Sequence, residues 1–343
     1  MNFASDNVTG VSPEIMAALA AANSGTAMPY GADAISQRLE ARFAEIFEHE
    51  VTVFPVPTGT AANALALATL TPPWGAIYCH EEAHIATDEC GAPEFFSAGA
   101  KLVALPGEHG KLDPAIVAER LTGQGVVHNV QPAALSLSQE TEAGTLYRAD
   151  EIAALAELAR RHGIALHMDG ARFANAVVGL DCAPAAITWR AGIDVLSFGA
   201  TKNGALAAEA VVFFDKAKAE TFAFRRKRAG HLLSKQRFVS AQLEAYLEGD
   251  LWLRNARHAN AMAARVGAGL ARLPGARLLH PVEGNEVFVA LPEKAIAVLA
   301  SAGFGFYRWG NEPVIRLVTA FDTKAGDVDA LVASAAQCLG TTA

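Results

Sequence analysis

A lysine follows an apolar run in the stretch 194–214, which reads DVLSFGATKNGALAAEAVVFF. Lys202 lies in the short turn between two runs that have the composition of buried strands. An ammonium group there must be paired, solvated or deprotonated, because burying an isolated charge is costly. A deprotonated lysine in a partly desolvated pocket can attack a carbonyl carbon and form a Schiff base. A solvated turn lysine is the alternative, and Lys202 alone does not decide between them.

Two other positions also follow apolar runs. Asp169 follows IALHM, and Gly59 and Thr60 follow VTVFPV at the start of a helical pattern. The free N–H groups and the dipole of a helix start favour phosphate, although most helix starts only carry a cap. Asp169 could hold a protonated ring nitrogen or a metal, or it could cap a turn. Taken with Lys202, 33 residues after Asp169, the set describes a site for pyridoxal 5'-phosphate (PLP).

Three further residues could act in such a site. His84, in EEAHIATDECGAP, could stack on the cofactor ring or move protons near neutral pH. His128, in VVHNVQP, could face the same pocket. A lone histidine, however, more often completes a hydrogen-bond network. Arg316 lies inside the apolar run VIRLVT and needs an anionic partner, which could be a substrate carboxylate or an internal acid.

Strand-like and helical patterns alternate along most of the chain. Apolar runs such as AALSLSQ and IDVLSFGA are separated by helical stretches such as RADEIAALAELARRHG, which Gly163 ends. This alternation predicts an α/β fold with a mostly parallel sheet covered by helices. After about Gly230 a long helical stretch leads to a compact βαββα-like unit. We therefore expect a large cofactor-binding domain over 1–245 and a small C-terminal α+β domain over 246–343, on which the N-terminal segment can pack.

Composition excludes several classes of protein. The 343 residues are 52% hydrophobic and carry a net charge of −8, with no basic face typical of nucleic-acid binders. No apolar run is long enough to span a membrane, and the first residues lack a secretory pattern. The cysteines are far apart, which predicts neither a disulfide framework nor a metal site: Cys79, Cys90, Cys182 and Cys338. A cytoplasmic enzyme with a small-molecule substrate is the expectation.

Five segments together resemble a known family. They read ASDNVTG, PYGAD, PTGTAAN, HMDGAR and IRLVT. The chain resembles, nearly end to end, the low-specificity L-threonine aldolases of the β-eliminating lyase group. These are fold-type I, PLP-dependent transferase-like enzymes. The fourth and fifth segments are specific in combination, whereas a phosphate loop alone would be a weak signal.

The resemblance implies a role for each matching residue. Lys202 would carry the cofactor, Asp169 would bond the pyridine nitrogen, and Arg172 would lie near the phenolic oxygen or the substrate carboxylate. The phosphate would be held by Gly59, Thr60 and Thr201. His84 would stack on the ring and face the substrate hydroxyl, with His128 close by. The α-carboxylate would be bound by Ser5 and Arg316, and Tyr30 would also contact the substrate.

Three segments depart from the family pattern. The lysine stands in TKNG where the family often has Ser-Lys-Gly, and SQETEAG replaces a common Glu-Asn-Thr-His-Asn. The third is RKRAGHLLSKQR, in which Arg228 and Lys235 are by spacing the counterparts of the family's cationic pair. Arg228 would then bind the substrate and Lys235 the phosphate, with Arg237 as an alternative to Lys235. The departures indicate a divergent subgroup whose preferred aldehyde can differ.

The activity implied is cleavage of L-threonine, L-allo-threonine and related β-hydroxy-α-amino acids to glycine and an aldehyde. His84, His128 or a water held by them would take the hydroxyl proton. The alternatives are a phenylserine aldolase or another β-eliminating lyase, with a larger pocket lined by Tyr30, Phe95 and Phe96. A catalytically inactive sensor or scaffold is more remote. The resemblance also implies a homodimer or homotetramer with active sites at the subunit interface.

Overall fold

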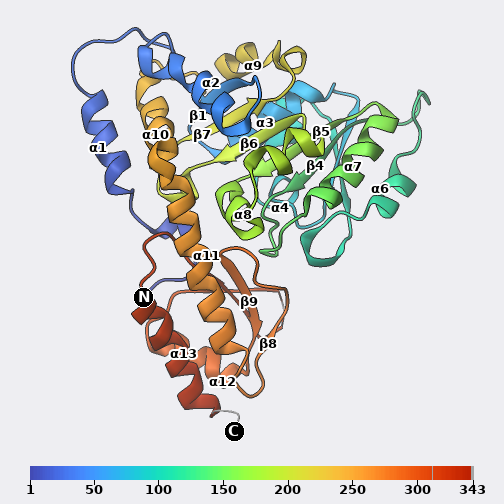
Figure 1. The fold of residues 1–343 in the computed structure, drawn as a ribbon. Coiled ribbons are helices and arrows are strands. Elements are labelled where there is room, and N and C mark those ends of the chain that lie inside the picture. Colours follow the sequence, from blue (N-terminus) through green and yellow to red (C-terminus); the bar gives the residue numbers. More distant parts are fainter. Residues whose placement is uncertain (311, 341–343) are drawn as a thin grey trace.

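The computed structural model describes residues 1–310 and 312–340, so residue 311 and the last three residues of the predicted small domain lie outside it (Figure 1). Seven strands form one sheet in the order β1-β7-β6-β5-β4-β2-β3. Only β7 runs against its neighbours. The mostly parallel sheet predicted from sequence is therefore confirmed. Its strands are β1 (Thr52–Val56), β2 (Gly75–His80), β3 (Lys101–Leu105), β4 (Gln131–Ser138), β5 (Ala165–Gly170), β6 (Val195–Gly199) and β7 (Glu209–Phe213).

Helices cover both faces of this sheet (Figure 1). Every residue of β2, β5, β6 and β7 is buried, which explains why these strands read as apolar runs without alternation. The helix α3 lies under the middle of the sheet and is itself mostly buried. The helices of this part are α1 (Pro13–Ala22), α2 (Ala34–Phe47), α3 (Gly59–Leu70), α4 (His84–Thr87), α5 (Ala92–Phe96), α6 (Pro114–Arg120), α7 (Ala149–His162), α8 (Phe173–Leu180), α9 (Phe222–Arg228) and α10 (Arg237–Leu247).

A second, four-stranded sheet lies beside the first part of the molecule, in the order β10-β11-β9-β8. The long helix α11 (Leu251–Leu270) runs from the large sheet to this second unit (Figure 1). The unit has its own apolar core and adds one short strand to the pattern expected from sequence. Its elements are β8 (Arg277–Leu278), β9 (Glu286–Ala290), α12 (Glu293–Ser301), β10 (Tyr307–Arg308), β11 (Val314–Val318) and α13 (Ala325–Leu339). The domain boundary at 245/246 stays a prediction; it falls near the end of α10.

The first residues of the chain contact the second unit and then lead to the large sheet. Phe3 N–H donates to Gly305 O at 2.7 Å, and Val318 N–H donates to Phe3 O at 2.7 Å. A short 3-10 turn, Asp6–Val8, follows directly. This path brings Asp6 between the two units.

No helix in residues 1–310 and 312–340 combines the length and the apolar character needed to cross a bilayer.

Candidate active site

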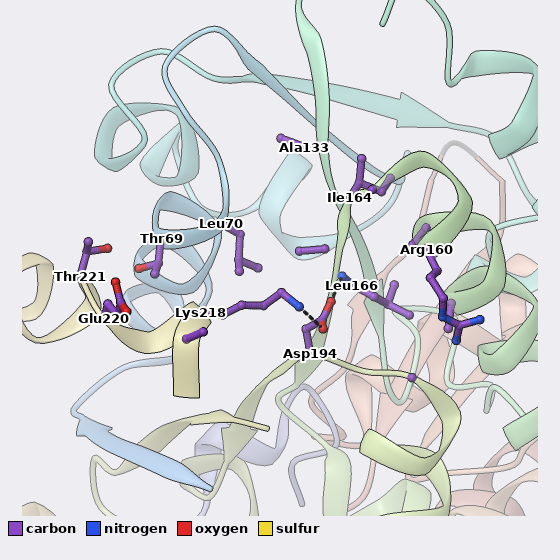
Figure 2. Close-up of a pocket in the computed structure, with 16 residues that line it drawn as sticks. Thr69, Leu70, Ala133, Arg160, Ile164, Leu166, Asp194, Lys218, Glu220 and Thr221 are labelled. Atoms are coloured by element: carbon purple, nitrogen blue, oxygen red, sulfur yellow. Dashed lines mark hydrogen bonds and ion pairs between the residues drawn. The ribbon is translucent and has the colours of Figure 1, made fainter. Parts of the chain in front are cut away.

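Two large hollows lie at opposite edges of the seven-stranded sheet. One, of about 650 Å³, opens where β5 begins, between α7 and the end of α3 (Figure 2). Its main polar feature is an ion pair between Lys218 Nζ and Asp194 Oδ1, 2.6 Å apart. None of the residues predicted to bind cofactor or substrate lines this hollow.

The other hollow, of about 400 Å³, lies at the carboxyl ends of the strands. We call it the cavity. Parallel strands end at one edge, so the residues that follow β1, β5 and β6 meet there. Because β7 runs the other way, its first residue, Glu209, reaches the same edge. The cavity is lined by seven residues predicted from the sequence, namely Gly59, Thr60, His84, Asp169, Arg172, Thr201 and Lys202.

The helix α3 begins at the cavity. Thr58 caps it: its Oγ1 accepts the N–H of Ala61 at 3.2 Å. A Cβ placed on Gly59 would meet no atom within 4 Å, so space is open in front of the first turn. The N-terminus of a helix attracts anions through its free N–H groups and its dipole. This end of the cavity can therefore hold a phosphate group.

Lys202 lies in a 3-10 turn, Thr201–Asn203, directly after β6. Within the part of the chain that the structure describes, no hydrogen bond or ion pair engages its amine. The turn itself is held firmly by Asn203, whose side chain donates to Tyr246 Oη at 2.7 Å and to Trp252 O at 2.9 Å. Asn203, which departs from the family pattern, thus fixes the lysine turn to α10 and α11.

A buried chain of hydrogen bonds joins Asp169 to His84. The amide of Asn63 donates to Asp169 Oδ2 at 2.7 Å and to Glu89 Oε1 at 2.9 Å. His84 Nδ1 lies 2.9 Å from the same oxygen of Glu89, and this hydrogen bond raises the pKa of the imidazole. Nδ1 is thereby engaged with Glu89, so Nε2 is the ring nitrogen left for proton transfer.

Asn63 and Glu89 were not predicted as site residues. The sequence does contain a signal for Asn63: it stands four residues after Gly59 in a helix otherwise rich in alanine and leucine. That spacing places both residues on one face of α3. Glu89 is five residues from His84, and nothing in its sequence context distinguishes it from a surface acid.

The two arginines both have internal partners. Arg172 lines the cavity and donates to Asp6 twice, with Nε–Oδ2 at 2.7 Å and Nη2–Oδ1 at 3.1 Å. Glu286 Oε1 lies 3.3 Å from Arg172 Nη2 and 2.5 Å from Arg316 Nη2. One carboxylate oxygen therefore bridges both guanidinium groups. Of the two partners that the sequence left open for Arg316, the internal acid is present, and Arg316 is not among the residues that line the cavity.

Three more glutamates line the cavity, and the sequence analysis missed them. Glu142 Oε1 accepts the N–H of His84 and the hydroxyl of Ser138, each at 2.8 Å. Glu209 Oε2 accepts the N–H of Ala200 at 2.9 Å. Burial raises the pKa of Glu142 and of Glu209 to about 7. The third, Glu140, follows β4. Two of the three stand in SQETEAG, whose departure from the family pattern was the available signal.

His128 is not brought to the cavity, which corrects the prediction for the single chain. It precedes β4, whose carboxyl end faces the cavity, so it lies at the opposite edge of the sheet. There it lines a different hollow with Tyr78, Lys101 and Glu119. Within one chain His128 therefore does not reach His84, because it flanks the amino end of β4 and the cavity lies at the carboxyl end.

The remaining predicted residues also lie outside the cavity lining. Ser5 caps the first 3-10 turn by accepting the N–H of Asn7, and it is Asn7 that reaches the cavity. Tyr30 is half exposed, with Lys227 Nζ 4.6 Å from its ring centre. Other residues of this group are on the surface or stack locally: Arg228, Lys235, Arg237 (on Phe238) and Phe95. Within one chain, none of them makes the predicted contact.

Comparisons with known proteins agree with this geometry. The beta-eliminating lyase family matches residues 2–294. A low specificity L-threonine aldolase from Pseudomonas aeruginosa is 46% identical over 94% of this chain and 93% of its own length. One from a Pseudomonas species is 44% identical over 96% of both chains. The solved structure of a threonine aldolase from Leishmania major has a TM-score of 0.92 and 28% identity, covering 99% of both chains.

Proposed function

Because the chain belongs to the beta-eliminating lyase family, we propose that it is a PLP-dependent aldolase for L-threonine, L-allo-threonine and related β-hydroxy-α-amino acids. Its products are glycine and an aldehyde. One observation carries this proposal: Lys202, with an unengaged amine, shares a cavity of about 400 Å³ with Asp169 and the start of α3.

The cavity fits PLP in its donors and in its unsatisfied atoms. Asn63 Oδ1, Glu89 Oε2 and Glu142 Oε2 are buried without a hydrogen-bond partner, although buried polar atoms normally have one. These oxygens accept hydrogen bonds, so a bound ligand with N–H or O–H groups, such as a substrate amine or hydroxyl, would offer such partners. Lys202 would hold the aldehyde, Asp169 the ring nitrogen, and Gly59, Thr60 and Thr201 the phosphate. When bound, PLP supplies an electron sink for the bond that breaks at the substrate α-carbon.

His84 is the proposed acceptor of the substrate's β-hydroxyl proton, directly or through a water. Glu89 holds its Nδ1, so the ring is oriented with Nε2 free for the transfer. Because the hydrogen bond to Glu89 raises the pKa of His84, the imidazole keeps the proton more readily after it has been taken. His128 could join the site only through another subunit.

The α-carboxylate is proposed to bind beside Arg172, which lines the cavity. Glu286 pairs with both Arg172 and Arg316 and so holds Arg316 close to Arg172. A guanidinium group suits a carboxylate because its N–H groups form a planar fork. Ser5 supports this end of the cavity indirectly, by capping the turn that carries Asn7.

A homodimer or homotetramer is proposed as the working form. Leu206 lines the cavity yet is 58% exposed, so one rim of the cavity faces outward. Surface residues without a contact to their own cavity would then serve the site of a partner: Tyr30, Arg228 and Lys235. All four cysteines are free, which is consistent with the cytoplasm as the proposed location.

The test is product analysis of the PLP-loaded protein with two substrates. L-Threonine should yield glycine and acetaldehyde in equal amounts. Phenylserine should react more slowly, because the residues proposed for a larger pocket, Phe95 and Phe96, do not line the cavity. Release of ammonia and a keto acid would instead indicate β-elimination, and no product from either amino acid would favour a non-catalytic protein.

A further inference from the structure

Five ionisable side chains meet where the large sheet joins the second unit, and we call them the arginine–acid cluster. They come from five different segments: Asp6, Glu140, Arg172, Glu286 and Arg316. The three acids are buried, with exposed fractions of 1%, 5% and 1% in that order. Arg172 and Glu140 also line the cavity. The cluster therefore forms the wall at which the proposed substrate carboxylate would bind.

The charges of the cluster balance only if one acid is neutral. Asp6 and Glu286 are the direct partners of the two arginines, which makes two anions and two cations. Burial opposes ionisation of Asp6, but Arg172 and Lys202 hold its pKa below the usual value. Burial, and then the charge of Glu286, raise the pKa of Glu140 well above its usual value. Glu140 is thus the member that keeps its proton.

The surroundings of Glu140 fit a neutral acid. Its Oε2 is the acceptor for Asn285 N–H at 3.4 Å, and its Oε1 is buried without a partner. A Cβ added to Gly284 would come within 1.7 Å of Oε2, so the side chain is closely packed against the second unit. A protonated carboxyl has an O–H to donate, whereas a carboxylate offers only acceptors. A substrate carboxylate would therefore meet a hydrogen-bond donor if Glu140 is protonated and a like charge if Glu140 is ionised.

We propose that Glu140 selects for the substrate's α-carboxylate: as a neutral acid it lets the arginine–acid cluster accept the carboxylate, and as an anion it excludes it. The proposal rests on the proposed function, because it names the role of one residue in that site. The groups that face Glu140 are Asp6 from the first turn, Arg172 before α8, and Asn285 and Glu286 at the start of β9. With Glu140 ionised, the cluster would hold three anions against two cations before any substrate binds, and the substrate carboxylate would be the fourth anion.

The experiment compares two amines on the PLP-loaded protein, glycine and ethanolamine. They are similar in size, and only glycine has a carboxylate. Binding of each is followed by the change in the visible absorbance of the cofactor between pH 6 and 10. The ratio of the two dissociation constants cancels the titrations that both amines share. In the native protein the preference for glycine should fall roughly tenfold across this range, as expected for a like charge nearby in a partly screened site.

Two neutral variants, Glu140→Gln and Glu140→Leu, should keep the neutral-pH preference for glycine to within about twofold at all pH values. Glu244→Gln is the matched control, since Glu244 is ion-paired with Arg38 on the surface; it should behave like the native protein. A falling preference in both neutral variants would overturn the proposal. So would their failure to bind PLP, because a neutral residue at 140 is expected to be tolerated.

The outcome is separable from that of the proposed function. The two amines need only bind, whereas the function requires carbon–carbon cleavage of threonine. If the preference for glycine is independent of pH in the neutral variants but the native protein does not cleave threonine, the role of Glu140 is supported and the aldolase function is refuted. If the native protein cleaves threonine but the preference falls with pH in the neutral variants as it does in the native protein, the aldolase function is supported and the role of Glu140 is refuted.

Discussion

At the scale of single residues, the fold controls the protonation of several groups in and beside the cavity. Glu89 holds His84, Arg172 holds Asp6, and burial keeps protons on Glu142 and Glu209 near pH 7. Perturbed titrations of this kind are common at functional sites, because catalysis needs groups poised near the working pH. Two predictions follow from these contacts.

Glu89→Gln should lower the pKa of His84, because the hydrogen bond from the imidazole to the Glu89 carboxylate is the largest cause of its rise. The measurement is the NMR titration of the His84 ring protons. The acidic limb of threonine cleavage should move to lower pH in the same direction, since a free imidazole is needed. Asp88→Asn, a change at the exposed neighbour, is the control. An unmoved His84 titration would show that Glu89 does not set its protonation.

Glu209→Gln should stabilise the cofactor-free protein at pH 8 more than at pH 5. The pKa of Glu209 is about 7 in the folded protein against 4.5 ordinarily, so between these values the folded state binds more protons than the unfolded state. Stability from this group is present at low pH and lost as the pH rises through 7. The gain at pH 8 should be at most roughly 3 kcal/mol, measured by urea unfolding. A gain that is equal at both pH values would contradict this assignment. Glu50→Gln, on the surface, should give no such pH-dependent gain.

At the scale of elements, the strand ends decide which residues can meet. The sequence was sufficient to place Gly59, Asp169 and Lys202 together, because each follows a recognisable strand at its carboxyl end. It was insufficient for Asn63 and Glu89, whose contacts depend on how α3 and the segment after α4 pack. It did not reveal that His128 flanks the amino end of β4, away from the cavity of its own chain. Pairing across units, as in the arginine–acid cluster, has no local sequence signal at all.

The lysine turn gives a prediction at this scale. Asn203→Ala should cost about 1–3 kcal/mol of unfolding free energy, because the two buried hydrogen bonds that Asn203 donates to Tyr246 Oη and Trp252 O are lost. It should also weaken PLP retention, since the turn carrying Lys202 loosens. Tyr246→Phe is the matched variant: it removes one of these bonds and should cost less. Equal stability of Asn203→Ala and the native protein would show that the turn is held by other contacts.

At the scale of the whole molecule, the proposed sharing of active sites between subunits can be tested with pairs of variants. Arg228, predicted from family spacing to bind the substrate, is the last residue of α9 and does not line the cavity of its own chain. If sites are shared between subunits, inactive variants should complement each other. Co-expression of Lys202→Ala with Arg228→Ala should restore about a quarter of native activity. Random pairing makes about half of the dimers hybrid, and one of the two sites in each hybrid dimer would be intact. No recovery would indicate that Arg228 does not act across an interface.

The lysine to which the cofactor attaches can be identified directly. The PLP-loaded protein is reduced with borohydride, which fixes the lysine–cofactor bond, and its peptides are mapped by mass spectrometry. We expect one modified residue, Lys202, at close to one cofactor per chain, and no modification in Lys202→Ala. Cofactor found instead on Lys218, in the hollow at the other edge of the sheet (Figure 2), or spread over surface lysines, would contradict it.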